Sequence, residues 1–392
     1  MSRALLLVLD GVGAGEAPDA RDYGDEGSDT LGNLSRAMGG LDLPCLGSLG
    51  LGNAHGSIMG VPPVERPLAS FGSMLEASAG KDSTTGHWEM MGIVTAEPFP
   101  TYPSGFPPEV IRALESAAGR KLIGNTPASG TRIIEELGPE HQRTGALIVY
   151  TSADSVLQIA AHEGVIEPQE LYDICERARQ VMLGPHAVSR VIARPFVGSP
   201  GSYVRTPGRR DFSIEPPGPG LLDLMEQAGI ARTGVGKVDD LFAGRSITTT
   251  HVRDNAEGLE VLLEMLRSTA SGLIFANLCD FDTRWGHRND MQGFARGLEE
   301  VDRAMPALLE AISEGEIMIA TADHGNDPTT SSTDHSRERV PLIAYSPGRS
   351  GADLGTRSSF SDAGATLAEL FGMETGLPGE SFLSAVMGTE RE

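Results

Sequence analysis

The feature that most constrains this chain is a set of short, unbroken apolar runs. Residues 4–10 read ALLLVLD, and the same character recurs in residues 273–280 (LIFANLCD), 316–323 (EIMIATAD) and 340–345 (VPLIAY). Runs of this length without polar alternation are typical of strands that are buried on both faces of a parallel sheet. The first three runs end in aspartate, which strongly favours strand ends over strand interiors.

Helical patterns separate these runs. In residues 294–312, apolar side chains recur at steps of three and four, and we expect Pro306 to bend this helix. Residues 256–268 show the same periodicity, with Asp254 or Asn255 as the N-cap. Strands that alternate with helices predict an α/β domain with a mainly parallel sheet flanked by helices.

The middle of the chain is set apart by proline and glycine. EPFPTYPSGFPPE begins at residue 97 and EPPGPG at residue 215, and strand and helix patterns lie between them. Such boundaries are typical of an inserted domain. We therefore predict a discontinuous core domain from residues 1–95 and 217–392, and a smaller inserted α/β domain from residues 96–216.

Composition narrows the compartment and the partners. The net charge is −23, from 31 Lys and Arg against 54 Asp and Glu, which disfavours nucleic acid and anionic membranes as partners. Cys45, Cys175 and Cys279 are far apart and form no CxxC motif, as in proteins of a reducing compartment. Asp10 interrupts the N-terminal apolar run too early for a signal peptide. We expect a cytoplasmic protein and leave its protein partners and oligomeric state open.

Acidic and imidazole side chains gather where the apolar runs end. They are Asp10 after the first run, Asp280, Asp282 and His287 after the second, and Asp323, His324 and His335 after the third. A single aspartate at a strand end is more often a helix cap, and one Asp-His pair can be a local hydrogen bond. Three clusters at three strand ends favour a site for two Mn²⁺ or Zn²⁺ ions, which uses about six such ligands.

Two glycine-containing segments need a separate reading. GVGAG (11–15) is GxGxG and not the dinucleotide fingerprint GxGxxG, so we interpret it as a tight turn that lets Asp10 approach a ligand. AGKDSTTGHWEMMG (79–92) predicts a helix N-terminus with Asp82 or Ser83 as the cap. A hydroxyl at that place can equally be a nucleophile beside a phosphate, and composition does not choose between the two roles.

Several longer strings resemble the phosphopentomutases of the alkaline phosphatase superfamily. They are GKDSTTGHWE (80–89), DFDTRWGHRND (280–290), TADHGNDPTTSSTDHSRERVPL (321–342), YGDEGSDTLGNL (23–34) and RVIARPFVG (190–198). Together with their surroundings they extend the resemblance over nearly the whole chain. The resemblance implies an alkaline-phosphatase-like core, two Mn²⁺ ions, and a mobile inserted cap that recognises the substrate.

The resemblance also implies roles for particular residues. One metal would take Asp10, Asp323 and His324, and the other would take Asp282, His287 and His335. Ser83, the first hydroxyl residue after Gly-Lys-Asp, holds the position of the nucleophile, which makes Thr84 and Thr85 the weaker candidates. The family usually has threonine at this position, but serine still supplies the hydroxyl. Asp334 would at most orient His335. The residues that match substrate-contacting positions are Ser152, Asp154, Val156, Arg190, Ile192, either Arg209 or Arg210 for a phosphate, and Lys237 near the hinge of the cap.

The implied reaction interconverts ribose 1-phosphate and ribose 5-phosphate, and the 2-deoxy sugars, through a phosphorylated Ser83 and a bisphosphate intermediate. A sugar bisphosphate is the implied activator. Two other hypotheses remain: a phosphatase or another phosphosugar or phosphoglycerate mutase on the same core, and a non-catalytic metal-binding protein. A sulfatase is disfavoured, because no Cys or Ser lies in the sequence context that its formylglycine requires.

Overall fold

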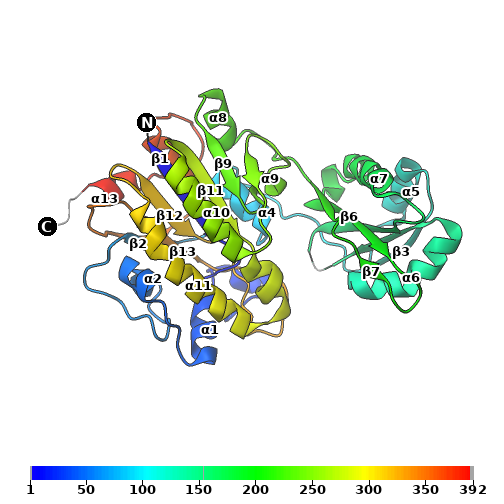
Figure 1. Ribbon diagram of the computed structural model, residues 1–392, viewed down its shortest axis with the longest axis horizontal. Coiled ribbons are helices and arrows are strands. Elements are labelled where there is room, and N and C mark those ends of the chain that lie inside the picture. The colour runs from blue at the N-terminus through cyan, green and yellow to red at the C-terminus, as the bar shows by residue number, and fades with distance from the viewer. Residues whose placement is uncertain (1, 153, 389–392) are drawn as a thin grey trace. The chain divides into compact units, whose positions relative to one another are not determined.

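A computed structural model describes residues 2–152 and 154–388 of the chain. The chain divides into two compact units, which we call the core unit (Met1–Pro98 with Pro216–Glu392) and the inserted unit (Phe99–Glu215). Both are α/β, so the predicted fold class is confirmed (Figure 1).

The core unit is built on one sheet of eight strands in the order β10-β9-β11-β1-β12-β13-β2-β14. Their bounds are β1 Arg3–Leu9, β2 Ser70–Met74, β9 Arg232–Val235, β10 Thr248–Thr250, β11 Gly272–Leu278, β12 Ile317–Thr321, β13 Val340–Tyr345 and β14 Asp353–Arg357. The strands from β10 to β12 pair in parallel, as the apolar runs predict. The run at residues 340–345 is also a strand, but β13 lies antiparallel to both β12 and β2. A continuous apolar run reports burial on both faces and not the direction of the strand.

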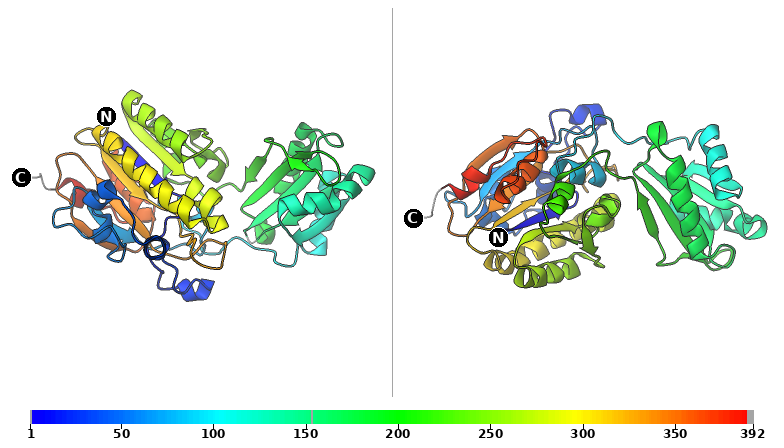
Figure 2. Two further views of the ribbon diagram at one scale, coloured as in Figure 1. Left: turned by 60° about the horizontal axis from the view of Figure 1, so that its bottom comes forward. Right: turned by 90° about the horizontal axis from the view of Figure 1, so that it is seen from above.

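Helices cover both faces of this sheet (Figure 2). α10 and α11 lie on one face, while α4 and α12 lie on the other. The helices of the core unit are α1 Thr30–Met38, α2 Pro44–Leu49, α3 Leu51–Ala54, α4 Ser83–Met90, α8 Leu221–Gln227, α9 Val238–Leu241, α10 Asn255–Ser268, α11 Met291–Glu310, α12 Ser361–Leu370 and α13 Leu383–Met387. Asp254 caps α10 by accepting a hydrogen bond from the Glu257 N–H, and Pro306 lies inside α11, as predicted.

The order of the strands decides where the candidate ligands come together. β11, β1 and β12 are adjacent and parallel in the middle of the sheet. Their carboxyl ends therefore meet at one edge, and each is followed by one of the acidic clusters. After β11 the chain makes a π-helical turn at Phe281–Trp285 and a 3₁₀ turn at Gly286–Arg288, which carry Asp282 and His287.

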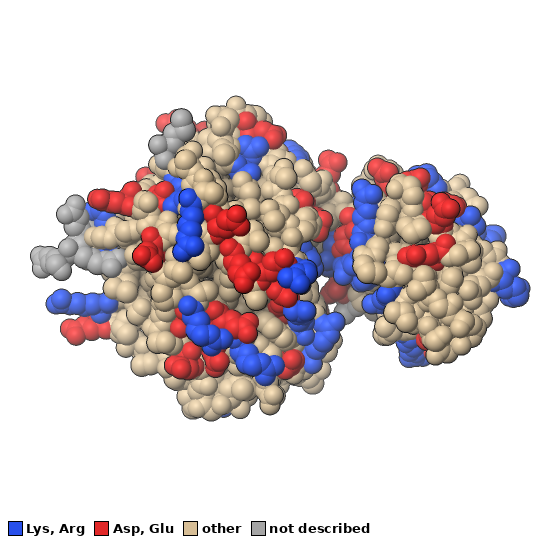
Figure 3. Space-filling view, in the orientation of Figure 1, with Lys and Arg blue, Asp and Glu red and all other residues tan. Residues whose placement is uncertain are grey.

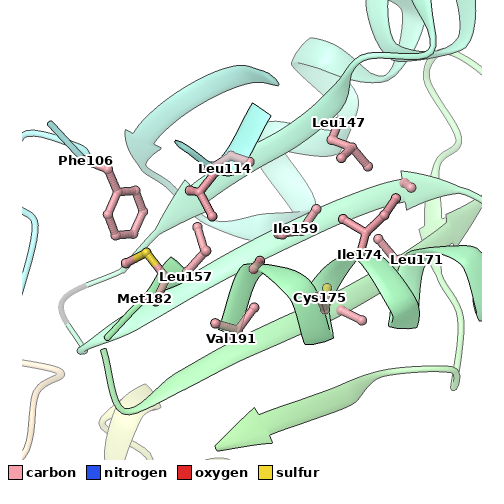
Figure 4. Packing of buried hydrophobic residues seen from close by; sticks show 14 of the residues in the cluster. Phe106, Leu114, Leu147, Leu157, Ile159, Leu171, Ile174, Cys175, Met182 and Val191 are labelled. Atoms are coloured by element: carbon pink, nitrogen blue, oxygen red, sulfur yellow. The ribbon is translucent and has the colours of Figure 1, made fainter. Parts of the chain in front are cut away.

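The inserted unit has its own sheet, in the order β3-β4-β5-β6-β7, with β8 paired to β6. Its elements are α5 Pro108–Ala118, β3 Leu122–Pro127, α6 Gly130–Thr144, β4 Leu147–Thr151, β5 Val156–His162, α7 Pro168–Val181, β6 Arg190–Val197, β7 Val204–Arg205 and β8 Arg210–Ser213. Apolar side chains of α5, α7 and one face of the sheet form a continuous core, to which Phe106, Leu157, Ile174 and Val191 belong (Figure 4).

The charged side chains do not form one extended surface of a single sign in the view of Figure 3. There, Lys and Arg lie interspersed with Asp and Glu over each unit. Among the described residues, no helix is both long enough and apolar enough to cross a bilayer.

Candidate metal centre and nucleophile

The first group of ligands brings together the ends of β1 and β12. His324 Nε2 lies 3.3 Å from Asp10 Oδ1 and 3.6 Å from Asp323 Oδ2. The second oxygen of Asp323 accepts a hydrogen bond of 3.0 Å from the Gly11 N–H. Gly11 adopts φ 79°, a left-handed conformation that suits glycine, so the tight turn predicted after β1 aims its N–H at this carboxylate.

The second group centres on Asp282. Its Oδ2 lies 3.2 Å from His287 Nε2, and its Oδ1 lies 3.2 Å from His335 Nε2. The two groups are contiguous, because ligand atoms of Asp282, His324 and His335 all lie within 4.8 Å of one another. The structure thus brings together all six side chains that the resemblance assigns to the metals, whereas Asp280 accepts the backbone N–H of Asn255.

The chemistry of this donor set fits divalent cations. The side chains of Asp10, Asp282 and Asp323 are each at most 7% exposed, and burying several carboxylates without positive partners is costly. Among the described residues, Asp323 Oδ2 and His335 Nε2 are buried and have no hydrogen-bond partner. The nitrogen–oxygen distances of 3.2–3.6 Å within each group would allow its side chains to hold one cation together.

The electrostatics of the cluster point the same way. Burial and the charge of Asp323 raise the pKa of Asp10. Burial would also raise the pKa of Asp282, but His335 and His287 hold this pKa well below its ordinary value. Burial opposes the charging of His324, yet Asp323 and Asp10 raise the pKa of its imidazole well above the ordinary range. The carboxylates therefore favour positive charge at this place, which a divalent cation would supply.

Ser83 begins α4 beside the first group. Its Oγ lies 3.1 Å from His324 Nε2 and 3.3 Å from Asp10 Oδ1. Asp82 is the N-cap and accepts hydrogen bonds from the N–H groups of Thr84 and Thr85. The Thr85 hydroxyl donates to Asp82 as well, at 2.6 Å. The cap role thus falls to Asp82, and of the two hydroxyls with recorded contacts, only that of Ser83 is directed at the metal ligands.

Three further residues hold the ligands, and the sequence did not single them out. Asn277 Nδ2 donates to Asp10 Oδ2 at 3.0 Å, and Asn326 Nδ2 donates to Asp282 Oδ1 at 2.7 Å. His87, which is fully buried, lies 3.1 Å from Asp323 Oδ2. Such partners orient ligands and tune their basicity. A signal for Asn277 was present, because a lone amide inside the apolar run LIFANL is a buried polar group that needs a partner.

The loop that carries His335 is anchored to the segment that leads to Ser83. Arg337 donates from Nη1 to Glu76 Oε2 at 2.8 Å and to the carbonyl oxygens of Ser78 and Gly80. It also pairs with Asp19 at 3.0 Å. One buried guanidinium therefore fixes the path of residues 76–80 against the loop after β12.

Lys81 adds a second link between these segments. Its Nζ lies 3.0 Å from Asp25 Oδ2 and 3.4 Å from Asp334 Oδ2. Asp334 Oδ1 accepts the backbone N–H of His335 at 2.9 Å. The acidic residue of the second Asp-His pair thus contacts the backbone of His335 and the side chain of Lys81.

The candidate substrate residues of the inserted unit lie on neighbouring strands. Val156 begins β5 and pairs in register with Arg190 of β6, while Ile192 pairs with Asp211 of β8. Arg209 donates two hydrogen bonds of 2.7 Å to the Asp211 carboxylate, and the Arg190 guanidinium lies 3.7 Å from the same carboxylate. Burial would raise the pKa of Asp211, but Arg209 and Arg190 hold it below its ordinary value.

Arg210 takes the opposite face of the inserted sheet. Its guanidinium lies over the rings of Tyr172 and Phe212, at 5.4 Å and 5.2 Å from their centroids. Arg194, in contrast, lies on the same face of β6 as Arg190 and Ile192, and Ile192 pairs with Asp211. Burial and then the charge of Arg209 lower the pKa of Arg194 to about 10. Strand alternation therefore separates the two neighbouring arginines that the sequence left as alternatives.

The remaining candidates are less constrained. Ser152 Oγ lies 3.5 Å from Asp154 Oδ2, within the inserted unit. Lys237 is exposed and follows β9 in the core unit. Val235 of β9 pairs with Ala276 of β11, so Lys237 lies just beyond the carboxyl ends of these parallel strands, and its charge lowers the pKa of the Cys279 thiol, which burial raises.

Comparison with known proteins first gives the class. Residues 2–375 match the family model described as the Metalloenzyme superfamily, so the chain is a metalloenzyme, as the donor set indicates. It is 56% identical over 388 residues to a phosphopentomutase of Dictyoglomus turgidum, with 98% of each chain covered. It is 56% identical over 386 residues to a phosphopentomutase of Anaeromyxobacter dehalogenans, again with 98% of each covered.

The chain therefore belongs to the phosphopentomutase family, whose members are isomerases that transfer a phosphoryl group, and the resemblance found in the sequence is confirmed. Among solved structures, a phosphoglycerate mutase of Leishmania mexicana is 13% identical, with a TM-score of 0.49 over 97% of each chain.

Proposed function

We propose that this protein interconverts ribose 1-phosphate and ribose 5-phosphate, and the corresponding 2-deoxyribose phosphates, by way of a phosphorylated Ser83. The observation that carries the proposal is the place of the Ser83 hydroxyl, within 3.3 Å of both Asp10 and His324. Family membership at 56% identity supports the same reaction.

Two divalent cations, for which we propose Mn²⁺, would activate the Ser83 hydroxyl and neutralise the charge of the transferred group. Asp10, Asp323 and His324 would hold one cation, and Asp282, His287 and His335 would hold the other. Ser83 is the first residue of α4, so a phosphoryl group on it would lie at the positive end of the helix dipole, while the N–H groups of Thr84 and Thr85 remain bonded to Asp82.

The reaction needs two transfers that balance. The phosphoryl group of phospho-Ser83 would pass to the free hydroxyl of the sugar phosphate, giving a 1,5-bisphosphate. After the intermediate turns around, Ser83 would accept the other phosphoryl group, which restores the phosphoenzyme and releases the isomer. A sugar bisphosphate would supply the first phosphoryl group to the unmodified serine.

The inserted unit would bind the distal phosphate through Arg209 and Arg190. Both guanidiniums share Asp211, and Arg194 lies on the same face of β6 as Arg190, so this place carries more positive than negative charge. Guanidinium groups match phosphate oxygens in geometry. Ser152, Asp154, Val156 and Ile192 would line the pentose, and Lys237 would contact the phosphate in the core unit. Arg210, stacked on Tyr172, would stabilise the sheet instead.

We place the enzyme in the cytoplasm, with a phosphorylated pentose as its substrate and a sugar bisphosphate as its activator. The three cysteines are unpaired, which supports a reducing compartment. Exclusion of water during transfer separates a mutase from a phosphatase, because a phosphoenzyme open to water hydrolyses.

The test follows ribose 1-phosphate by ³¹P NMR with Mn²⁺-loaded protein and a trace of glucose 1,6-bisphosphate. We expect ribose 5-phosphate to appear with no matching rise in inorganic phosphate. Free phosphate as the main product would show that the protein acts as a phosphatase and would contradict the proposed mutase reaction. Turnover of a phosphoglycerate but not of the pentose would contradict the proposed substrate.

A further inference from the structure

The motif TGHWE (85–89) lies in α4, and its residues dock this helix onto the metal centre. Gly86 lies against the backbone of Asp323: a Cβ at this position would stand 2.2 Å from the Asp323 carbonyl oxygen and 2.9 Å from its carbonyl carbon. Only glycine permits this approach. Trp88 Nε1 donates to the Leu241 carbonyl at 2.8 Å, which fixes the helix on its other side.

His87 follows Gly86 and contacts both chemical parts of the site. Its Nδ1–H donates to the Ser83 carbonyl oxygen at 2.8 Å. The same nitrogen lies 3.1 Å from Asp323 Oδ2. Apart from this contact, Asp323 Oδ2 has no hydrogen-bond partner among the described residues, so it stays available to a metal. The bond to a carbonyl also fixes Nδ1 as the protonated nitrogen.

The surroundings of His87 leave it little freedom. The side chain is fully buried, and its ring stacks on Phe275 of β11 with 5.5 Å between centroids. In the described part of the chain, its Nε2 is buried and has no hydrogen-bond partner. A buried imidazole with one unsatisfied nitrogen is costly for stability alone, since an apolar side chain would fill the same space without that cost.

We propose that His87 is a positioning residue that holds Ser83 in register with the metal ligand Asp323. The imidazole sets the spacing between the first residue of α4 and the carboxylate, so that the serine hydroxyl and Asp323 Oδ2 face the same place. This inference rests on the proposed function of the core site, and adds a residue to which nothing in the metal or nucleophile set assigns a role.

The experiment uses three substitutions of His87 that differ in where they place a donor. Asn carries an amide nitrogen at the same distance from Cβ as Nδ1, whereas Gln carries it at the distance of Nε2. His87→Asn thus keeps the donor that faces Ser83 and Asp323, and His87→Gln moves it away. His87→Leu fills the space without any donor.

Two readouts separate positioning from folding. The first is the Kd for Mn²⁺ of the unphosphorylated protein, measured by competition with a chelator, which needs no turnover. The second is the split between kcat and KM with ribose 1-phosphate. We expect His87→Gln and His87→Leu to raise the Kd and lower kcat about 10–100-fold, with KM nearly unchanged. His87→Asn should stay within a few-fold of the wild type.

His141 offers a matched control in the inserted unit. It too is fully buried, donates from Nδ1 to the Ala146 carbonyl at 2.6 Å, and accepts the His162 N–H at Nε2. We expect His141→Leu to lower the melting temperature and to leave the Mn²⁺ Kd unchanged.

Equal Mn²⁺ affinity and kcat in the Asn and Gln variants of His87 would overturn the proposal. If His87→Leu fails to fold, as judged by near-UV circular dichroism, the Asn and Gln pair still decides it. A failure of the proposed function is distinct, because then the wild type itself would neither bind Mn²⁺ at this site nor turn over the sugar phosphate.

Discussion

The core unit and the inserted unit each contain a cluster of side chains with charges of one sign, but the two clusters are held in different ways. In the core unit, three buried carboxylates lie at the ends of adjacent parallel strands, and neutral amides such as Asn277 hold them. In the inserted unit, several guanidiniums lie on one face of a sheet, and the single carboxylate of Asp211 holds two of them. The first arrangement calls for a cation and the second for an anion.

The difference teaches which kind of site a sequence can reveal. The core ligands follow strands that are visible as apolar runs, and parallel strands bring their carboxyl ends to one edge. The arginines of the inserted unit lie within or beside strands, where their direction depends on register. A shift of one residue moves a side chain to the other face.

The largest expected effect comes from Ser83, the proposed nucleophile of the core unit. Ser83→Ala should lower mutase turnover by at least about 10⁴-fold, because removing a nucleophile abolishes the covalent route. Ser83→Thr keeps a hydroxyl and should retain measurable turnover. Thr84→Ala is the control in steady-state assays and should remain active. An inactive Thr84→Ala variant beside an active Ser83→Ala variant would assign the nucleophile to Thr84 instead.

Removal of the metal should destabilise the core unit and leave the inserted unit unaffected. A ligand at 100 times its Kd stabilises the native state by about 2.7 kcal/mol, and only the core unit holds the proposed ligands. Chelation should therefore speed amide hydrogen exchange in β1, β11 and β12, by up to about 100-fold if local opening exposes the site. α7 and β6 should exchange as before. Equal loss of protection in both units would contradict the placement of the site.

The amides that hold the carboxylates should matter next. Asn277→Leu has a similar volume but no donor to Asp10, so Mn²⁺ affinity should fall about 10–100-fold in calorimetric titration. Asn53 is the control: its amide pairs with Val64 at 2.9 Å, away from the ligands. Asn53→Leu should lower the melting temperature and keep the affinity. An unchanged Mn²⁺ affinity in Asn277→Leu would show that the hydrogen bond from Asn277 to Asp10 does not contribute to metal binding.

The smallest effect tests the two faces of the inserted sheet. Arg209→Ala should raise the KM for ribose 1-phosphate about 10-fold or more, because a charge-assisted hydrogen bond to phosphate is lost. Arg210→Ala should leave KM nearly unchanged and lower stability, since this guanidinium stacks on Tyr172 and Phe212. The opposite pattern in steady-state kinetics would mean that the distal phosphate binds to the other face.

Much of the fold and of the metal site was predictable for one physical reason. Long apolar strands and Asp or His residues that follow them are local patterns, and the α/β rules convert them into neighbours in space. The direction of β13 was not predictable, because burial on both faces looks the same for either direction. The roles of His87 and Asn326 depend on how α4 and the loop after β12 approach other strands, which no local pattern records. Asp334, the sequence neighbour of His335, accepts the backbone N–H of that residue and pairs with Lys81.

The most direct test of the central claim is to locate the covalent phosphate. The Mn²⁺-loaded protein is incubated with glucose 1,6-bisphosphate, digested, and mapped by tandem mass spectrometry across residues 79–92. The account predicts phosphate on Ser83. It also predicts that excess ribose 5-phosphate removes this phosphate, because the phosphoryl group passes to the sugar and leaves as the bisphosphate. Phosphate on Thr84 or Thr85, or a peptide that is never phosphorylated while the enzyme turns over, would contradict it.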